Sequence, residues 1–259
     1  MGKRLENAKS LYLEAIRDGN AEAIHKYAGA RYTQHSTPVK DGREGFIEFF
    51  EDFYERNPVR DIEVVRGFED GPFVFVHVVQ SLNHGQYRYV TADIFETDED
   101  GKMIEHWDII AEMVDETVSG HTQVGGPTEP TDLDKTEANK SLVRGFLNDV
   151  LQGGDYDKLT DYISTEAYIQ HNPQVGDGLE GLGVFVESLT EQGLTMVYDE
   201  IHRIIGCGNF VASLSKMRLG ATDMAVIDLF RVADGRIVEH WDVMEEIQPK
   251  ETWVNSGKF

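Results

Sequence analysis

The sequence predicts two α+β domains in tandem, each with helices first and a run of antiparallel strands afterwards. The first observation is an internal repeat, because Glu105-His106-Trp107-Asp108 recurs as Glu239-His240-Trp241-Asp242, 134 residues later (240 − 106) in a chain of 259. The second is that similar strand-like segments precede both copies, Asp93-Ile94-Phe95 in one and Asp228-Leu229-Phe230 in the other. A period of this length marks two globular domains, since solenoid repeats span roughly 20 to 50 residues.

Each half opens with helical periodicity. Apolar residues at three-to-four spacing predict a long first helix and a shorter second one, separated by Asp18-Gly19-Asn20 in the first half and by Gly153-Gly154 in the second. A third helix begins after Gly-rich turns. In the first half the predicted helices cover 5–17, a shorter segment that ends at Tyr27, and 45–54. In the second half they cover 135–152, 156–162 and 181–190.

The remainder of each half is rich in β-branched and aromatic residues and predicts strands. These cover 62–68, 73–82, 86–96 and 103–114, then 197–205, 210–218, 224–232 and 237–247. Helices followed by such strands indicate a sheet that curls against one helix layer, with a pocket where the sheet curves away. We expect domain 1 over 1–120, a Gly- and Pro-containing linker over 121–136 and domain 2 over 137–259.

Composition restricts the partners. With 47 acidic and 24 basic side chains, the formal charge of −23 repels phosphate backbones and anionic lipid surfaces, so we expect neither nucleic acid nor membrane as a partner. No apolar stretch is long enough for a signal peptide or a membrane span, which favours a cytoplasmic location. Cys207 has no partner for an internal disulfide and is interpreted as a small structural residue.

Two sequence strings carry a family resemblance. Tyr168-Ile-Gln-His-Asn-Pro173 and Asp234-Gly-Arg-Ile-Val-Glu-His-Trp-Asp242 resemble SnoaL-like proteins of the nuclear transport factor 2-like superfamily, in particular a branch described as predicted aldol-condensation-catalysing proteins. The resemblance covers nearly all of both halves. It implies two cystatin-like or nuclear transport factor 2-like cone domains, each a curved sheet with about three helices and a central cavity. It also implies an intrachain pseudo-dimer, with further homo-oligomers left open.

Two acids are the candidates for catalysis. Asp93 and Asp228 each lie in an apolar, strand-forming run, on the same face as the Phe two residues further on. If that face looks into the cavity, such an acid is suited to take a proton from a carbon next to a carbonyl; the alternative is an outward or purely structural acid. Resemblance to the polyketide cyclases, which pair a strand Asp base with a nearby His, maps the His onto His77. The second half has Leu214 at that position, so the first half has the stronger claim to acid–base chemistry.

Further polar residues of both repeats are expected to bind substrate. Some follow the second helix, near the cavity mouth of the family's fold, although turn hydrogen bonds explain them equally well. Others lie on the strand face opposite Trp107 and Trp241, which we interpret as packing residues, and alternation does not tell which face is wet. These expected substrate-binding residues are Tyr32, His35, His106 and Asp108 in the first half and Tyr168, His171, Asn172, His240 and Asp242 in the second.

No cofactor is expected. His106 and Asp108 with His77 or His35 have the residue types of a two-His, one-carboxylate iron site, but such matches arise easily among nine His and 47 acids. Gly-rich phosphate loops, nucleophile elbows and zinc Cys clusters are absent from the sequence. The sequence predicts a cofactor-independent enzyme, without a metal, that abstracts a proton next to the carbonyl of a small apolar compound in an aldol-type cyclisation, isomerisation or dehydration. The alternative is a non-catalytic small-molecule-binding or scaffold protein.

Overall fold

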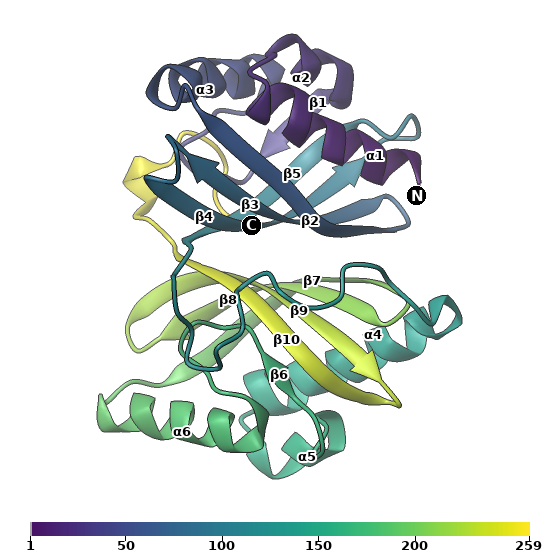
Figure 1. The fold of residues 1–259 in the computed structure, drawn as a ribbon, viewed down its shortest axis with the longest axis vertical. Helices are drawn as coiled ribbons and strands as arrows, with labels where there is room; N and C mark the ends of the chain where they lie inside the picture. The colour runs from purple at the N-terminus through teal and green to yellow at the C-terminus, as the bar shows by residue number, and fades with distance from the viewer. Residues whose placement is uncertain (1) are drawn as a thin grey trace. The chain divides into compact units, whose positions relative to one another are not determined.

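Helices precede a mostly antiparallel sheet in each half of the chain, as predicted, in the computed structural model, which describes residues 2–259 (Figure 1). The first half has α1 (Lys3–Ser10), which continues as a π-helical segment (Leu11–Arg17), α2 (Glu22–Tyr27) and α3 (Gly42–Arg56). The second half has α4 (Thr136–Phe146) with a π-helical continuation (Leu147–Gln152), α5 (Leu159–Tyr162) and α6 (Gly178–Glu191). Short 3-10 turns cover Leu133–Lys135, Tyr156–Lys158 and Lys250–Thr252.

Each half contributes one five-stranded sheet. The first has the order β1-β5-β4-β3-β2 and the second β6-β10-β9-β8-β7. The strands are β1 (Ala28–Gln34), β2 (Arg60–Asp70), β3 (Phe73–Leu82), β4 (Tyr87–Thr97), β5 (Met103–Glu112), β6 (Ile169–Gln170), β7 (Met196–Cys207), β8 (Phe210–Leu219), β9 (Thr222–Ala233) and β10 (Arg236–Glu246). The eight predicted strands are confirmed. The sequence pattern missed β1 and β6, which pair in parallel with β5 and β10, because β6 has two residues and β1 has no apolar alternation.

The helices of each unit cover one face of its own sheet (Figure 1). In the first sheet, Val74, Val76 and Phe95 point to this face and pack in one core with Leu11 and Phe46. Every second residue along a strand points to the same face, and residues paired across neighbouring strands share a face too. The register therefore also places Asp93, opposite Val76, and Asp108, opposite Asp93, under the helices.

The helix face of the second sheet is built in the same way. Val211, Val226 and Phe230 pack there with Val143 and Phe146 of α4. Asp228 lies between Val226 and Phe230 in alternation on β9, and its partner across the ladder is Asp242. A pair of facing carboxyl groups is thus part of the helix-covered face in both sheets.

The segments that follow each sheet are exchanged between the two compact units. Unit 1 consists of the first half up to Met113 together with Gln248–Phe259, and unit 2 consists of Val114–Ile247. This division differs from the predicted domains 1–120 and 137–259 with a linker over 121–136. The two tails resemble each other in sequence, so the repeat alone does not tell which sheet each tail packs against. No helix among residues 2–259 is both long and apolar enough to cross a membrane.

Candidate active site

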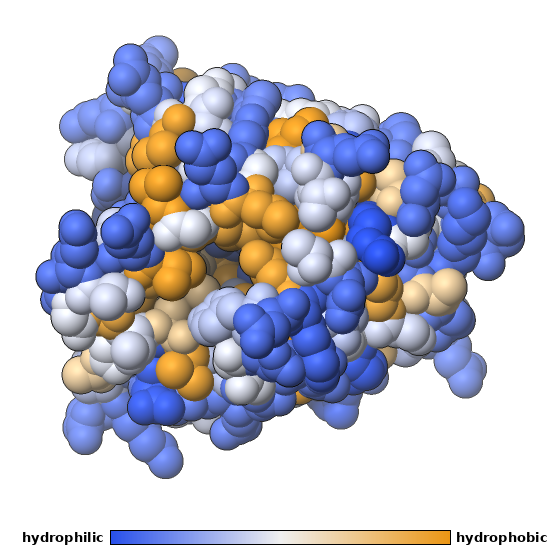
Figure 2. Space-filling view, turned by 90° about the horizontal axis from the view of Figure 1, so that it is seen from below, coloured by the Kyte–Doolittle hydropathy of each residue, from blue (hydrophilic) through white to orange (hydrophobic). Residues whose placement is uncertain are grey.

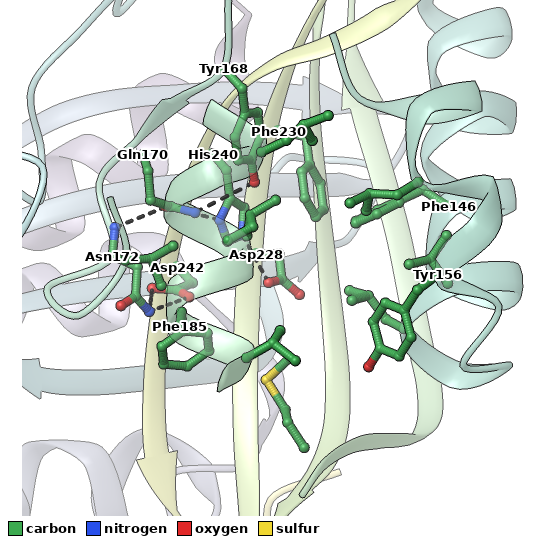
Figure 3. A pocket seen from close by; sticks show the side chains of 18 of the residues that line it. Phe146, Tyr156, Tyr168, Gln170, Asn172, Phe185, Asp228, Phe230, His240 and Asp242 are labelled. Carbon is green, nitrogen blue, oxygen red and sulfur yellow. Dashed lines mark hydrogen bonds and ion pairs between the residues drawn. The ribbon is translucent and has the colours of Figure 1, made fainter. Parts of the chain in front are cut away.

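Unit 2 encloses a cavity of about 300 Å³ between its helices and its sheet (Figure 3). Most of the wall is apolar, with Phe146, Phe185 and Met244 among the lining side chains. Six polar residues gather at one part of the wall, where strands β6, β9 and β10 lie, on the side opposite Tyr156 (Figure 3). They are Tyr168, Gln170, Asn172, Asp228, His240 and Asp242. This combination of an apolar cavity and a few convergent polar groups is typical of a small-molecule site.

Asp228 is buried at this wall and contacts three polar side chains. The Tyr198 hydroxyl donates to its Oδ1 at 3.0 Å, and the Ser213 hydroxyl donates to its Oδ2 at 3.1 Å. His240 Nε2 lies 3.1 Å from Oδ1. Burial and the charge of Asp228 raise the pKa of Tyr198 well above its usual value, so this phenol remains a donor.

The contacts of His240 fix where its protons lie. Gln170 Oε1 accepts the backbone N–H groups of His171 and Asn172 at 2.9 and 3.0 Å, so this atom is the carbonyl oxygen. His240 Nδ1 therefore donates to Gln170 Oε1 at 3.1 Å, and any proton on Nε2 is shared with Asp228. Burial lowers the pKa of His240, but the hydrogen bond to Asp228 and the charges of Asp242 and Asp228 outweigh it and raise this pKa above 6.5.

Asp242 faces Asp228 across the ladder between β9 and β10. Asn172 Oδ1 accepts the Gln174 backbone N–H at 2.8 Å, which directs its Nδ2 toward Asp242 Oδ1 and Oδ2 at 2.9 and 2.7 Å. Burial and the charge of Asp228 raise the pKa of Asp242 above 3.8, against the opposing effects of His240 and Asn172. Two neighbouring acids of unlike environment are the arrangement in which one is a base and the other a hydrogen-bond donor.

The repeated motifs explain how the local sequence builds this site. β6 lies beside β10 in parallel register, with Gln170 next to His240. Alternation along β10 turns His240 and Asp242 to the cavity and turns Glu239 and Trp241 to the other face. His171 follows this second set, since it contacts Glu239 through Nε2 at 2.9 Å and stacks on Trp241 at 4.7 Å.

His35 and His171 therefore do not line either cavity, although they were expected near a cavity mouth. Each donates from Nδ1 to a tail carbonyl, His171 to Thr122 at 2.6 Å and His35 to Gly257 at 2.7 Å. His35 repeats the remaining contacts of its counterpart, with Glu105 at 2.9 Å and a ring stacked on Trp107 at 4.8 Å. Both rings lie on the sheet face away from the helices and hold the tail of the other repeat.

Unit 1 keeps the two Asp residues and the His but arranges them differently. Tyr12 and Thr91 donate to Asp93 at 2.6 and 2.9 Å, and His106 Nε2 lies 2.8 Å from it. Tyr12 comes from a helical segment and Tyr198 from a strand, so the two copies supply the same hydroxyl from different elements. The unit 1 cavity is only about 100 Å³ and is lined by His106 and Asp108 but not by Asp93.

Tyr32 and Tyr168 are equivalent in the two repeats but lie in different surroundings. Tyr168 lines the unit 2 cavity, where burial raises its pKa far above the usual value. Tyr32 is buried behind Phe46, with the rings stacked at 5.2 Å, and does not line the unit 1 cavity. Only the second tyrosine is therefore in position to contact a ligand.

A lysine from the exchanged tail distinguishes unit 1 further. Lys258 Nζ lies 3.3 Å from Asp108 Oδ1, and the two side chains are only 3% and 9% exposed. Burial raises the pKa of Asp108, but the charge of Lys258, with smaller contributions from His106 and Ser36, outweighs it and lowers this pKa below 3.8. The equivalent carboxyls of the two units, Asp108 and Asp242, thus have pKa shifts of opposite direction.

The predicted partnership of His77 with Asp93 is wrong. His77 pairs with Ala92 in the ladder, and Asp93 pairs with Val76, so the two side chains point to opposite faces. Arg66 donates to His77 Nδ1 at 2.9 Å on the face away from the helices. The neighbouring strand was predicted correctly, but the register differs by one residue from the one a dyad requires. His77 therefore gives the first half no stronger claim to acid–base chemistry than the second.

Among residues 2–259, Asp228, His240 and Asp242 are the group whose ligand atoms, all within 4.8 Å, come close enough for a metal ion. Their ligand atoms already have hydrogen-bond partners, which are Asn172 for Asp242, and Tyr198 and His240 for Asp228. An ion would have to displace these contacts, so the donor set fits a hydrogen-bonded network better. The iron arrangement considered for His106 and Asp108 does not form, since His77 and His35 lie on the other face.

Several residues of the two polar clusters were not found from sequence. Gln170 stands in the repeated Gln-His pair, so its recurrence was the available signal. Tyr12 and Tyr198 gave none, because they occupy unrelated positions in the two repeats. Lys258 gave none either, since its role depends on the exchange of the tails.

Comparison with known protein families finds the same domain twice in the chain. The family model described as SnoaL-like domain matches residues 10–106 and again 143–240. No curated protein matches the chain. Similar solved structures include a protein of unknown function with a cystatin-like fold from Xanthomonas campestris, 24% identical, with a TM-score of 0.37 over 44% of this chain and 97% of that one. A Bacillus cereus protein provisionally described as a polyketide cyclase is 20% identical, with a TM-score of 0.38 over 41% and 73% of the two chains.

An LEH-like epoxide hydrolase of M. tuberculosis is 25% identical, with a TM-score of 0.34 over 43% of this chain and 85% of that one. The solved structures thus each correspond to less than half of this chain. The family model in contrast matches both halves, and each match ends at the His of the repeated Glu-His-Trp-Asp motif. The protein belongs to the SnoaL-like family and is a tandem duplication of its domain.

Proposed function

We propose that unit 2 is a cofactor-independent acid–base catalyst that abstracts a proton next to the carbonyl of a small apolar compound. The observation that carries the proposal is the pair of facing carboxyl groups, Asp228 and Asp242, at the polar wall of an apolar cavity, with His240 Nε2 3.1 Å from Asp228. A proton on carbon next to a carbonyl is removed efficiently only if a base and a donor for the developing oxygen charge act together.

Asp228 is the base in this proposal. Its oxygens accept hydrogen bonds from Tyr198, Ser213 and His240, which hold the carboxylate in place at the cavity wall. When Asp228 takes the substrate proton, the C–H bonding pair moves into the carbonyl group and forms an enolate. The negative charge thereby moves from Asp228 to the enolate oxygen, and the net charge of the site is unchanged.

Asp242 stabilises the enolate oxygen. In this proposal Asp242 is the carboxyl group that carries a proton and donates it in a hydrogen bond, which its raised pKa favours, and Asn172 fixes its orientation. Return of the proton to another carbon gives isomerisation. Attack of the enolate carbon on a second carbonyl gives aldol cyclisation, and loss of a β-hydroxyl gives dehydration. All three reactions share the same first step.

Unit 2 is the better candidate of the two units. Its cavity is about three times that of unit 1 in volume, 300 against 100 Å³. Asp228 lines its cavity, whereas Asp93 does not line that of unit 1. Lys258 holds Asp108 in the charged form, which cannot donate a hydrogen bond to an enolate.

The test measures exchange of the methyl protons of 2-acetylnaphthalene with D₂O by NMR, alongside binding of this ketone by calorimetry. Asp228→Asn is expected to slow the protein-catalysed exchange by about 10²- to 10⁴-fold, the usual contribution of a general base, and to leave binding in place. Exchange at the wild-type rate in this variant refutes the proposed base. Binding without exchange in the wild-type protein favours the alternative, a binding module.

A further inference from the structure

The third helices of the two units differ at several positions that line the unit 2 cavity. Aligning α3 with α6 at the offset of 136 residues (178 − 42) places Leu182 where unit 1 has Phe46. Gly183 stands where unit 1 has Ile47, and Val186 where it has Phe50. Each replacement in unit 2 is smaller. Since Leu182, Gly183 and Val186 all line the larger cavity, the loss of side-chain volume on this helix accounts for its size.

Helix α6 is also less tightly packed than α3. Gly45, Phe46 and Phe50 of α3 are buried, whereas Leu189 is the buried residue of α6. A Cβ added at Gly183 would meet no atom within 4 Å, so there is room beside this helix. The space in unit 2 is thus bounded by α6 and can be filled from it.

The mouth of the cavity lies where lining residues are also exposed. Tyr156 is 49% exposed and Val186 is 41% exposed, and both line the cavity. The face of the molecule over α5 and α6 is hollowed, with hydrophobic residues around and inside the hollow (Figure 2). Asp228 and His240 in contrast are buried, at the sheet side of the cavity. A ligand therefore enters with its polar group first and leaves its apolar part toward α6.

The charge of the wall limits which ligands enter. Asp228 and Asp242 are the acidic lining residues and His240 is the imidazole between them, and none of the cavity-lining side chains among residues 2–259 is Lys or Arg. A ligand carboxylate or phosphate would lose its hydration without gaining a cation. The chain as a whole, at −23, adds to the repulsion of anions.

The geometry points to an uncharged carbonyl compound of about two fused rings as the ligand of unit 2, with Leu182, Gly183 and Val186 as the residues that set this size limit. An engineered apolar cavity of about 150 Å³ binds benzene, so a cavity of about 300 Å³ accommodates roughly twice that ligand. The cavity of unit 1, about 100 Å³, is below the size for one ring. The inference rests on the proposed function for the carbonyl group, whereas the limits on size and charge follow from the cavity itself.

The experiment compares the binding of three probes by calorimetry: 2-acetylnaphthalene, the one-ring ketone acetophenone, and 6-acetyl-2-naphthoate, which adds a carboxylate to the bicyclic ketone. Wild-type protein is expected to bind the bicyclic ketone at least tenfold more tightly than its carboxylate analogue. Leu182→Phe with Val186→Phe, which introduces the residues of unit 1, is expected to weaken binding of the bicyclic ketone at least tenfold. Acetophenone binding changes less than threefold.

Val184→Phe is the matched control, because Val184 is on the same helix, is 60% exposed and does not line the cavity. It should leave all three affinities unchanged. Gly183→Ile is a second, independent variant that fills the cavity from an open position, and circular dichroism checks that each variant is folded. Equal binding of ketone and carboxylate overturns the charge limit, and unchanged bicyclic binding in both cavity-filling variants overturns the size limit. Because these readouts are affinities, they stand apart from the proton-exchange test.

Discussion

The different environments of Asp108 and Asp242 predict losses of stability of different size for the same substitution. In Asp108→Asn, the ammonium of Lys258 remains buried, 3% exposed, without the carboxylate 3.3 Å away. Removing one partner of a buried ion pair costs about 3–5 kcal/mol. In Asp242→Asn, no lysine is left behind. Asn172 keeps one of its two oxygen acceptors, so the expected cost is one hydrogen bond, about 1 kcal/mol.

Hydrogen exchange read by mass spectrometry is the appropriate assay, because it reports the free energy of opening for each unit separately. Asp108→Asn should lower the protection of β5 in unit 1 by the larger amount, and Asp242→Asn should lower the protection of β10 in unit 2 by the smaller one. Adding Lys258→Met to Asp108→Asn removes the unpaired charge and should restore part of the protection. Equal losses in the two single variants, or no recovery in the double variant, refute the electrostatic difference between the sites.

The pairing of Asp108 with Lys258 also predicts how the stability of unit 1 changes with pH. The pKa of Asp108 is lowered, so its contribution to stability is present above 3.8, the unfolded value, and is lost as the pH falls through the folded pKa. The difference between wild type and Asp108→Asn should therefore shrink in acid. A difference that grows in acid contradicts the assignment of Lys258 as the charge partner.

Three further predictions concern unit 2. Gly183→Ala should raise the free energy of unfolding by about 0.5–1 kcal/mol in a denaturant titration, because the added Cβ meets open space. Gly181→Ala should lower the free energy of unfolding, because its Cβ would overlap a backbone carbonyl. Tyr198→Phe should lower the free energy of unfolding by roughly 1.5–3 kcal/mol through loss of a donor to a charged group, and a loss under 0.5 kcal/mol would contradict this. The raised pKa values of His240 and Asp242 each contribute stability, which is complete below pH 6.5 for His240 and below pH 3.8 for Asp242 and is lost as the pH rises through the folded pKa. Protection from hydrogen exchange in unit 2 should therefore decrease above pH 6.5. A constant protection would show that neither group is perturbed.

The fold was predictable from sequence where the pattern was periodic. Eight strands and the helices follow from apolar spacing, because each buries one face against the same core. β1 and β6 were not predictable, since their place at the sheet edge depends on parallel pairing with β5 and β10 and not on their own composition. The exchange of tails was hidden for a different reason. The two tails are alike, so their sequence is compatible with either sheet.

The site was predictable only in part. Alternation correctly placed Asp228 on the face of Phe230, and the repeat drew attention to His240 and Asp242. The contacts of Asp93 with His77 were predicted wrongly because a strand position gives the neighbour but not the register. Lys258 shows the remaining limit, since a charge 150 residues away in sequence decides the state of Asp108.

The most direct measurement compares Asp228→Asn with Asp93→Asn in the exchange of the methyl protons of 2-acetylnaphthalene with D₂O. Both substitutions remove a buried strand carboxylate bonded to a tyrosine and a histidine, so they are matched in structural cost. The account predicts that Asp228→Asn slows the protein-catalysed exchange by about 10²- to 10⁴-fold and that Asp93→Asn, once shown to be folded, retains it. Loss of exchange in Asp93→Asn alone would contradict the assignment of catalysis to unit 2.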